Sequence, residues 1–236
     1  MDDIILKNYT LKYNPEDPNY IFFIPNPNIY YKCSEFAFST GFDYIHKIVM
    51  KTREHPEALN VLKDYLDKFP NKINCINDSG WTPLHLACRN SNADSTEETV
   101  WFLLSHPKID VNLRVSHGRT ALHLACQNSN TDSTEITVEI LLSHPNTNVN
   151  LQDESGKTAL ILACENSDFY STEITVEILL SYSSQEHHRC SLQDELRSSN
   201  INVNLQDKNG QTALHWACRF NHIKAVEMLL KYKLIN

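Results

Sequence analysis

Apolar residues recur at a helical spacing along most of the chain. Leu84, Ala87 and Cys88 occupy positions i, i+3 and i+4, which places them on one face of a short helix. The run 135–142 repeats this spacing and predicts a second type of helix. Because neither helix can bury its apolar face alone, the pattern predicts pairs of helices that gain stability by stacking on neighbouring pairs.

A seven-letter block occurs four times and defines the period of the pattern. The blocks read TPLHLAC, TALHLAC, TALILAC and TALHWAC, and they begin at Thr82, Thr120, Thr158 and Thr212. The first three blocks therefore begin at a constant interval of 38 positions, whereas the fourth begins 54 positions after the third. A glycine lies two residues before each block, which predicts a turn with a positive φ.

These blocks resemble the ankyrin repeat, whose signature T-P-L-H-x-A lies in a unit of about 33 residues. The resemblance implies an all-α fold, a solenoid of stacked helix-turn-helix units with β-turn fingers. It also implies that His85, His123 and His215 form hydrogen bonds to the backbone near the fingers. With a degenerate N-terminal unit, the expected number of repeats is about five.

Insertions explain why the period exceeds that of the family. Segments such as 91–97 lengthen the turn between the two helices of a repeat. Asp94 with Glu97, and Asp132 with Glu135, have the spacing of a capping box, so we expect these aspartates to cap the second helices.

A longer insertion at 184–199 accounts for the wider interval between the third and fourth blocks. It is polar and lacks apolar periodicity, so we expect a surface loop. His187, His188 and Cys190 lie in this loop, but no fourth ligand at a matching spacing accompanies them. We therefore interpret these side chains as solvated.

Two segments precede the four clear repeats in 77–236. Residues 38–76 are predicted to be a degenerate capping repeat, since His46 aligns with His85 without a gap. Residues 1–37 hold four prolines and many aromatics. They predict either an extended arm packed on the first repeat or a segment that becomes ordered on a partner. The second helix of 38–76 is expected to bury Leu59, Leu62 and Leu66 and to expose Lys63, Asp64, Asp67 and Lys68.

Composition narrows the classes of function. The 236 residues include 21 Lys and Arg against 29 Asp and Glu, for a net charge of −8, which disfavours nucleic-acid binding. Seven cysteines without a CxxC pair favour a reducing, intracellular compartment, such as the cytoplasm, over a disulfide scaffold. No segment resembles a targeting signal or a membrane span. The 24 asparagines gather in fingers and turns, where their side chains can bond to the backbone.

No pattern in the chain predicts catalysis, a metal site or a cofactor. Three blocks contain His-x-x-Cys, as at His85 and Cys88, but equivalent residues of stacked helices lie about 8–10 Å apart. Zinc requires its ligands at about 2.3 Å, so a shared metal is not expected. Phosphate-binding, GxSxG and HExxH motifs do not occur. We expect neither an enzyme nor a metalloprotein.

The ankyrin resemblance implies a protein-binding surface made of finger tips and the exposed ends of the first helices. Trp81 is the strongest candidate anchor, because its counterparts are polar. The alternative, that Trp81 packs on the preceding repeat, stays open. The predicted binding residues are Asp78, Ser79, Trp81, Arg89, Asn90, Ser116, His117, Arg119, Gln127, Asn128, Glu154, Lys157, Glu165, Lys208, Gln211, Arg219 and Phe220.

The sequence therefore predicts a non-catalytic adaptor or effector that binds a protein partner through this concave surface. The alternative is a scaffold that self-associates through an uncapped last repeat. The repeats, rich in asparagine and isoleucine, also resemble the ankyrin arrays of giant DNA viruses of amoebae or of AT-rich protists. The viral resemblance implies a protein that acts in a host cell.

Overall fold

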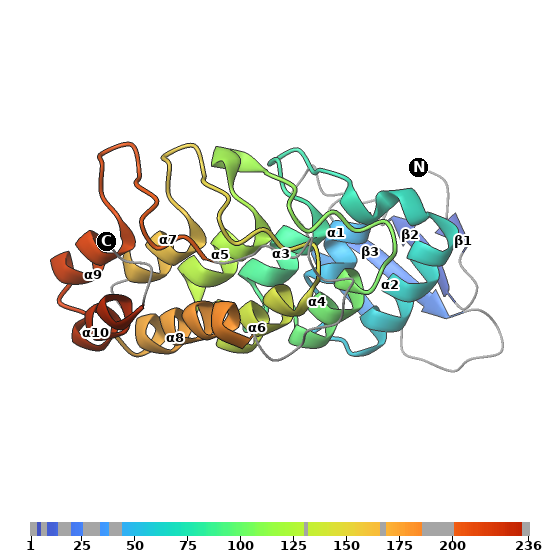
Figure 1. Ribbon diagram of the computed structural model, residues 1–236. Coiled ribbons are helices and arrows are strands. Elements are labelled where there is room, and N and C mark those ends of the chain that lie inside the picture. Colours follow the sequence, from blue (N-terminus) through green and yellow to red (C-terminus); the bar gives the residue numbers. More distant parts are fainter. Residues whose placement is uncertain are drawn as a thin grey trace. The chain divides into compact units, whose positions relative to one another are not determined.

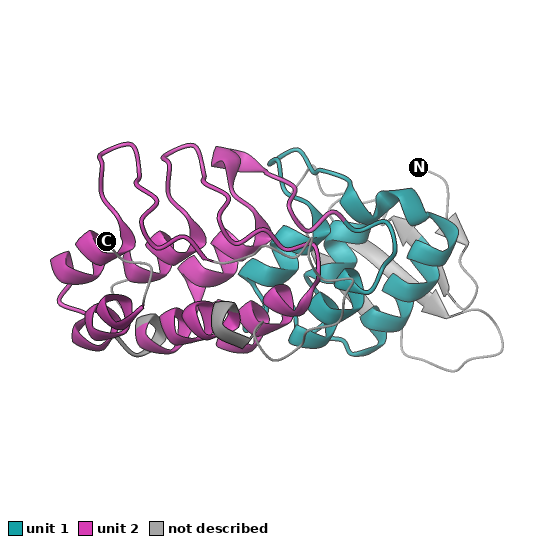
Figure 2. Cartoon of the chain, viewed as in Figure 1, with its two compact units in different colours: residues 1–109 teal, residues 110–236 magenta. Residues whose placement is uncertain are grey.

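The computed structural model describes residues 4–5, 9–13, 20–25, 34–37, 44–129, 132–165, 169–185 and 201–232 (Figure 1). The chain divides into two compact units, residues 1–109 and 110–236 (Figure 2). Most of the predicted loop at 184–199, with His187, His188 and Cys190, lies outside the described residues. Residues 184–185 belong to the end of a helix.

Unit 1 contains a four-stranded antiparallel sheet in the order β1-β2-β3-β4. Leu11 lies opposite Phe23 in its register and is fully buried. This sheet, which precedes the repeats, was not predicted from the sequence. The strands are β1 (Ile4–Ile5), β2 (Tyr9–Tyr13), β3 (Tyr20–Pro25) and β4 (Ser34–Ala37).

Two helical pairs follow the sheet in unit 1. Helix α2 buries Leu59, Leu62 and Leu66 as its pattern predicted, but it also buries Asp64, which was expected to face water. Thr82 caps α3 by accepting a hydrogen bond from the backbone N–H of His85. The helices are α1 (Tyr44–Val49), α2 (Glu57–Lys68), the 3₁₀ helix η1 (Pro70–Asn74), α3 (Pro83–Arg89) and α4 (Glu97–Leu104).

Unit 2 contains three helical pairs arranged in two layers. Inner helices α5, α7 and α9 pack side by side, and outer helices α6, α8 and α10 form the second layer, away from the fingers (Figure 1). The helices are η2 (Ser116–Gly118), α5 (Ala121–Asn128), α6 (Glu135–Ser143), α7 (Ala159–Glu165), α8 (Phe169–Gln185), α9 (Ala213–Arg219) and α10 (Ile223–Lys231).

Small buried side chains let the inner helices approach closely. Ala125 and Cys126 of α5 are fully buried, as are Ala163 and Cys164 of α7. A bulky side chain at these positions would separate the stacked helices. The all-α ankyrin solenoid predicted for the repeats is therefore confirmed, with five helical pairs among the described residues. None of the helices in the described ranges is both long enough and apolar enough to span a bilayer.

Threonines, and not aspartates, cap the outer helices α4 and α6. The side chain of Thr96 accepts a hydrogen bond from the backbone N–H of Thr99, and Thr134 does the same in the next repeat. The expected capping boxes at Asp94 and Asp132 were therefore wrong. The threonines lie two residues closer to the apolar run, where their side chains reach the free N–H groups of the first turn.

Carboxylates and glycines shape the fingers of unit 2. Asp153 Oδ1 accepts hydrogen bonds from the backbone N–H groups of Ser155 and Lys157, at 2.8 and 2.9 Å, and Asp207 makes the same pair of bonds in the next finger. Gly156 then adopts a φ of 78°, which reverses the chain at little cost. These two fingers are thus preorganised by their own aspartate side chains.

Hydrogen bonds also join neighbouring repeats within unit 2. The backbone N–H of Lys208 donates to Ser155 O at 2.9 Å, so finger tips are connected directly. Asn112 accepts a hydrogen bond at Oδ1 from the backbone N–H of Asn148, at 2.9 Å, and donates from Nδ2 to the backbone of the same segment. The asparagines at these positions therefore have a structural role.

A histidine provides a further connection between repeats. The backbone N–H of Thr120 donates to His123 Nδ1, so the proton of the neutral ring lies on Nε2. That Nε2 donates to Lys157 O at 3.1 Å. In unit 1, His46 Nε2 makes the equivalent bond to Trp81 O at 2.9 Å. This equivalence supports the alignment of the degenerate repeat with the others.

Candidate protein-binding surface

The predicted binding residues interact in pairs eight positions apart. The first residue of each pair follows a finger glycine, and the second closes the inner helix of the same repeat. In unit 1, the guanidinium carbon of Arg89 lies 5.6 Å from the centroid of the Trp81 ring. This distance is that of a cation–π contact. Trp81 is half-buried, and whether it anchors a partner stays a prediction.

Two pairs in unit 2 are polar. Arg119 donates from Nη1 to Gln127 Oε1 at 2.6 Å, and the Lys157 ammonium contacts both carboxylate oxygens of Glu165, at 2.6 and 2.7 Å. Arg119 also lies 3.4 Å from the buried Asp153 carboxylate. Because these charges hold one another in place, the long side chains lose part of their rotamer freedom before any partner arrives.

Trp216 lies between two cations in the last repeat of unit 2. The Lys157 ammonium is 4.5 Å from the centroid of its ring, and the guanidinium carbon of Arg219 is 5.2 Å away. The indole N–H donates to Asp207 Oδ2 at 3.0 Å. Phe220 stacks on the indole with ring centroids 6.0 Å apart and planes 13° apart. Trp216 is only 7% exposed.

Asp207 is the electrostatic centre of this cluster. Burial opposes its charged form, but hydrogen bonds from the Gln211 backbone, the Trp216 side chain and the Asn209 backbone outweigh that effect and lower the pKa of Asp207. The carboxylate therefore stays charged at neutral pH. It fixes the finger through Oδ1 and the indole through Oδ2.

Most of the remaining predicted residues are available to a partner. One exception is Asn90, which is 6% exposed and donates from Nδ2 to Leu86 O at 2.9 Å. The related Asn128 is half-buried and bonds to Leu124 O. The exposed members of the predicted set are Asp78, Ser79 and Arg89 in unit 1, and His117, Gln127, Glu154, Lys208 and Arg219 in unit 2. The half-buried members in unit 2 also include Ser116, Arg119, Lys157, Glu165, Gln211 and Phe220.

Two residues of the cluster, Trp216 and Asp207, were missing from the sequence-based prediction. Trp216 was omitted because it lies at an inner-helix position that is leucine in three blocks, as at Leu124. The signal was present, since a large aromatic with an N–H group replaced a purely apolar side chain. The predicted binding residues of unit 2, together with Trp216, are called the finger surface below.

The finger surface carries polar, cationic and aromatic groups but no assembled catalytic group. Within the described part of the chain, no three histidine, cysteine or acidic side chains lie close enough to hold a metal ion. Burial raises the pKa of the Cys164 thiol to about 12 and raises that of Cys126 as well, so these thiols are not nucleophiles at neutral pH. The arrangement fits recognition of another molecule through salt bridges, hydrogen bonds and stacking.

The comparisons with known proteins agree with this architecture. A chain in the crystal structure of EF0377, an ankyrin repeat protein, superposes with a TM-score of 0.61 at 19% identity, and the match covers 84% of both chains. A segment of 37 residues is 43% identical to acyl-CoA-binding domain-containing protein 6 of Bos taurus. That segment is 16% of this chain and spans 13% of the bovine protein.

A family model describes most of the repeat region. The model for ankyrin repeats, in three copies, matches residues 45–136 and again residues 133–236. The first match begins within α1, so it includes the degenerate repeat that lacks the signature block. With the helical pairs, the fingers and the histidine bonds described above, this match shows that the chain belongs to the ankyrin-repeat family.

Proposed function

We propose that this chain is a non-catalytic adaptor that binds a protein partner through the finger surface. Ankyrin repeats generally mediate protein–protein interaction, and the family is typically non-catalytic. The observation that carries the proposal is the cluster of Lys157, Trp216, Arg219 and Phe220, in which two cations and two aromatic rings are held in fixed contact. Aromatic and arginine side chains most often dominate the energy of an interface.

Preorganisation makes this cluster a suitable anchor. Lys157 is held by Glu165, and the Trp216 indole is held by Asp207, so docking would immobilise few additional side chains. Arg219 is exposed and has its guanidinium against an indole face. The surface therefore fits a partner that offers acidic or carbonyl groups beside an apolar side chain.

The proposal is tested with the paired substitution Lys157→Ala/Arg219→Ala. Partners are first identified by affinity capture with the wild-type chain, and their binding to purified variants is then measured by calorimetry. We expect the double substitution to weaken binding at least about tenfold, as expected for loss of two interface anchors. Lys231→Ala, which removes an exposed cation from α10, is the matched control and should bind as the wild type does. Equal affinity of all three chains would contradict the proposal.

A second candidate function is self-association through the last repeat. Ile223 and Leu230 of α10 are 62% and 61% exposed, and Cys218 is exposed although the equivalent Cys126 is buried under the neighbouring helix. These apolar groups support pairing with a second copy. Light scattering over a hundredfold range of concentration tests this, since a constant monomer mass would exclude it.

We infer a reducing, intracellular location. Among the described residues, Cys88, Cys126, Cys164 and Cys218 form no disulfide. Free thiols at several positions favour a compartment that keeps them reduced. Fractionation of cells that produce the tagged chain would test this, and recovery of the chain from the medium with oxidised cysteines would contradict it.

A further inference from the structure

The outer helices of unit 2 present exposed isoleucines at equivalent positions. Ile136 of α6 and Ile174 of α8 are 54% and 47% exposed, and α6 packs beside α8. One turn further along each helix, Ile140 and Ile178 are half-buried. Single exposed isoleucines are common on protein surfaces, but these four side chains occupy adjacent rows on two packed helices. They form an apolar strip on the layer opposite the fingers.

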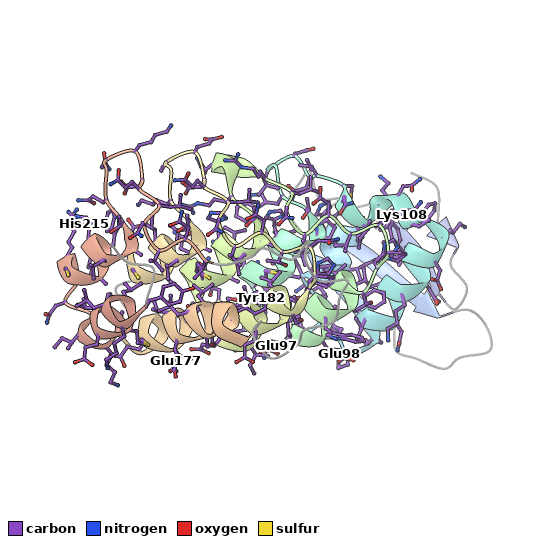
Figure 3. The ribbon with its side chains drawn as sticks, viewed as in Figure 1. Glu97, Glu98, Lys108, Glu177, Tyr182 and His215 are labelled. Carbon is purple, nitrogen blue, oxygen red and sulfur yellow. The ribbon has the colours of Figure 1, made fainter. Side chains whose placement is uncertain are left out.

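A row of carboxylates accompanies this strip. Glu139, Glu177 and Glu227 occupy the same helical position on α6, α8 and α10, and all three are exposed. Figure 3 shows Glu177 on the side of α8 that faces away from the fingers. Packed helices lie about 8–10 Å apart, which is about one Debye length at physiological salt. Salt therefore screens the repulsion between these carboxylates only in part.

The helices that carry this row supply few cations to neutralise it. Helix α6 contains no lysine or arginine, and neither do the described side chains of α8. On α10, Lys224 contacts Glu173 of α8 at 2.8 Å and so neutralises a carboxylate outside the row. Helix α2 in unit 1, by contrast, has Lys63 and Lys68 beside Asp67, the usual mixture of signs on a solvated helix.

We propose that this outer acidic face, made of Ile136, Glu139, Ile140, Ile174, Glu177, Ile178 and Glu227, is a second protein-docking surface whose partner is a basic amphipathic helix. Leucine or isoleucine side chains of such a helix would cover the isoleucine strip. Lysine or arginine side chains three or four positions away would meet the glutamates. The charge argues against other occupants, since nucleic acids and anionic membranes would both be repelled.

This docking surface is distinct from the finger surface. The two surfaces belong to different helix layers of unit 2, and they share no residue. The net charge of −8 also disfavours a second copy of the chain as the occupant. One molecule could therefore hold two partners at once, one on each layer.

Binding of a synthetic peptide tests the proposal directly. The probe is a labelled peptide of about 18 residues with leucines at i, i+3, i+4 and i+7 and lysines on both sides of the leucine stripe. Its affinity for the full chain is measured by fluorescence anisotropy at about 0.15 M salt, where long-range attraction is screened. A peptide of the same composition, with its leucines dispersed around the helix, is the control ligand.

Two sets of substitutions locate the bound peptide. Glu139→Gln/Glu177→Gln/Glu227→Gln should weaken binding about tenfold through three lost ion pairs. Ile136→Ser/Ile174→Ser should weaken it about fivefold by removing apolar contact. Asp67→Asn/Asp94→Asn/Asp132→Asn removes the same charge from exposed positions outside both surfaces and should change affinity less than about twofold. Unchanged melting temperatures show that each variant is folded.

Three results would overturn the proposal. Equal affinity for the striped and the dispersed peptide would mean that only net charge is recognised. An equal loss in the control triple substitution would mean that the peptide responds to net charge and does not occupy the outer acidic face. A dimer in light scattering that Ile136→Ser/Ile174→Ser abolishes would assign the face to a second copy. If Lys157→Ala/Arg219→Ala loses binding at the finger surface but retains peptide binding, the two surfaces bind independently. The two proposals can then be judged separately.

Discussion

Burial separates the cysteines of the repeats into two chemical classes. Cys126 and Cys164 are completely buried between helix layers, and burial raises the pKa of the Cys164 thiol to about 12. Cys218 has the same position in its repeat but is exposed. Only the thiolate reacts with alkylating reagents, so identical sequence positions differ in reactivity because of their surroundings alone.

We expect iodoacetamide at pH 8 to label Cys218 within minutes and to leave Cys126 and Cys164 unlabelled in the folded chain. The buried thiols should react only after the repeats unfold, because exposure and ionisation are both required. Peptide mapping by mass spectrometry reads each cysteine separately. Urea-unfolded protein, in which all cysteines should react alike, is the control. Rapid labelling of Cys126 without urea would show that α5 is not packed as described.

His123 should make the stability of unit 2 depend on pH. Burial lowers its pKa, with partial compensation from the hydrogen bond to the Lys157 backbone. The unfolded chain therefore binds a proton at a higher pH than the folded chain does. It follows that stability is greatest above the unfolded pKa of about 6.5 and falls as the pH drops toward the lower folded value.

The variant His123→Gln isolates this contribution. It cannot take up the proton, so its free energy of unfolding should lie below that of the wild type at pH 7.5 and approach it at pH 5. Urea titrations at several pH values measure the difference. Other histidines titrate in both chains and cancel in the comparison. A difference that grows toward pH 5 would contradict the assignment of a neutral, buried imidazole.

At the scale of elements, the fingers depend on both backbone conformation and packing. Gly156 and Gly210 have nearly the same φ, 78° and 74°. A Cβ on Gly156 would lie 2.9 Å from the backbone nitrogen of Lys208 in the next finger, whereas a Cβ on Gly210 would meet nothing within 4 Å. Substituting each glycine in turn therefore separates the cost of backbone strain from the cost of contact with the next finger.

Gly210→Ala should cost about 1 kcal/mol, the price of an L-residue in the left-handed region. Gly156→Ala should cost at least about 2 kcal/mol, because the added methyl group also pushes against the neighbouring finger. Thermal or urea unfolding of both variants provides the measurement. Equal losses would indicate that the fingers move apart freely and that contact between them contributes little.

The helical pairs could be predicted from the sequence because their determinants are local and repeated. The spacing of Leu84, Ala87 and Cys88 fixes one helix face, and the same spacing recurs in each block. The capping residues were less certain, since Asp94 and Thr96 both have side chains that accept hydrogen bonds and lie only two positions apart. Boundaries within a polar turn therefore had to come from the structure.

The sheet and the aromatic cluster lay beyond sequence reasoning for a different reason. Strand pairs such as Leu11 with Phe23 join residues whose local pattern is interrupted by prolines. Lys157 and Trp216 are 59 positions apart. Their contact could be predicted only if the repeats were aligned with the long insertion left out. Contacts between distant segments depend on the assembled stack and not on any local signal.

At the scale of the whole molecule, the junction before the last repeat lacks one of the family's connections. Ile161 occupies the position of His123, and its side chain has no N–H group to donate to the next finger. We expect the amides of α9 and α10 to exchange with deuterium before those of α5.

Ile161→His tests the importance of the missing bond. The substituted ring would have Thr158 as its partner, as His123 has Thr120, and Gln211 O as its acceptor. Hydrogen exchange in α9 should slow relative to the wild type, while exchange in α5 stays unchanged. Unchanged or faster exchange in α9 would show that packing, and not this bond, limits the opening of the last repeat.

The asparagine bonds have a consequence for how the chain is assembled during synthesis. The bond between Asn148 and Asn112 spans 36 positions, whereas that between Asn202 and Asn150 spans 52. On a ribosome, each earlier repeat can close on its predecessor as soon as one further unit has emerged. The last repeat must wait for the whole insertion to be translated. The longer loop itself raises the free energy of loop closure by less than about 1 kcal/mol. Until then, the inner face of α7 stays uncovered in the nascent chain.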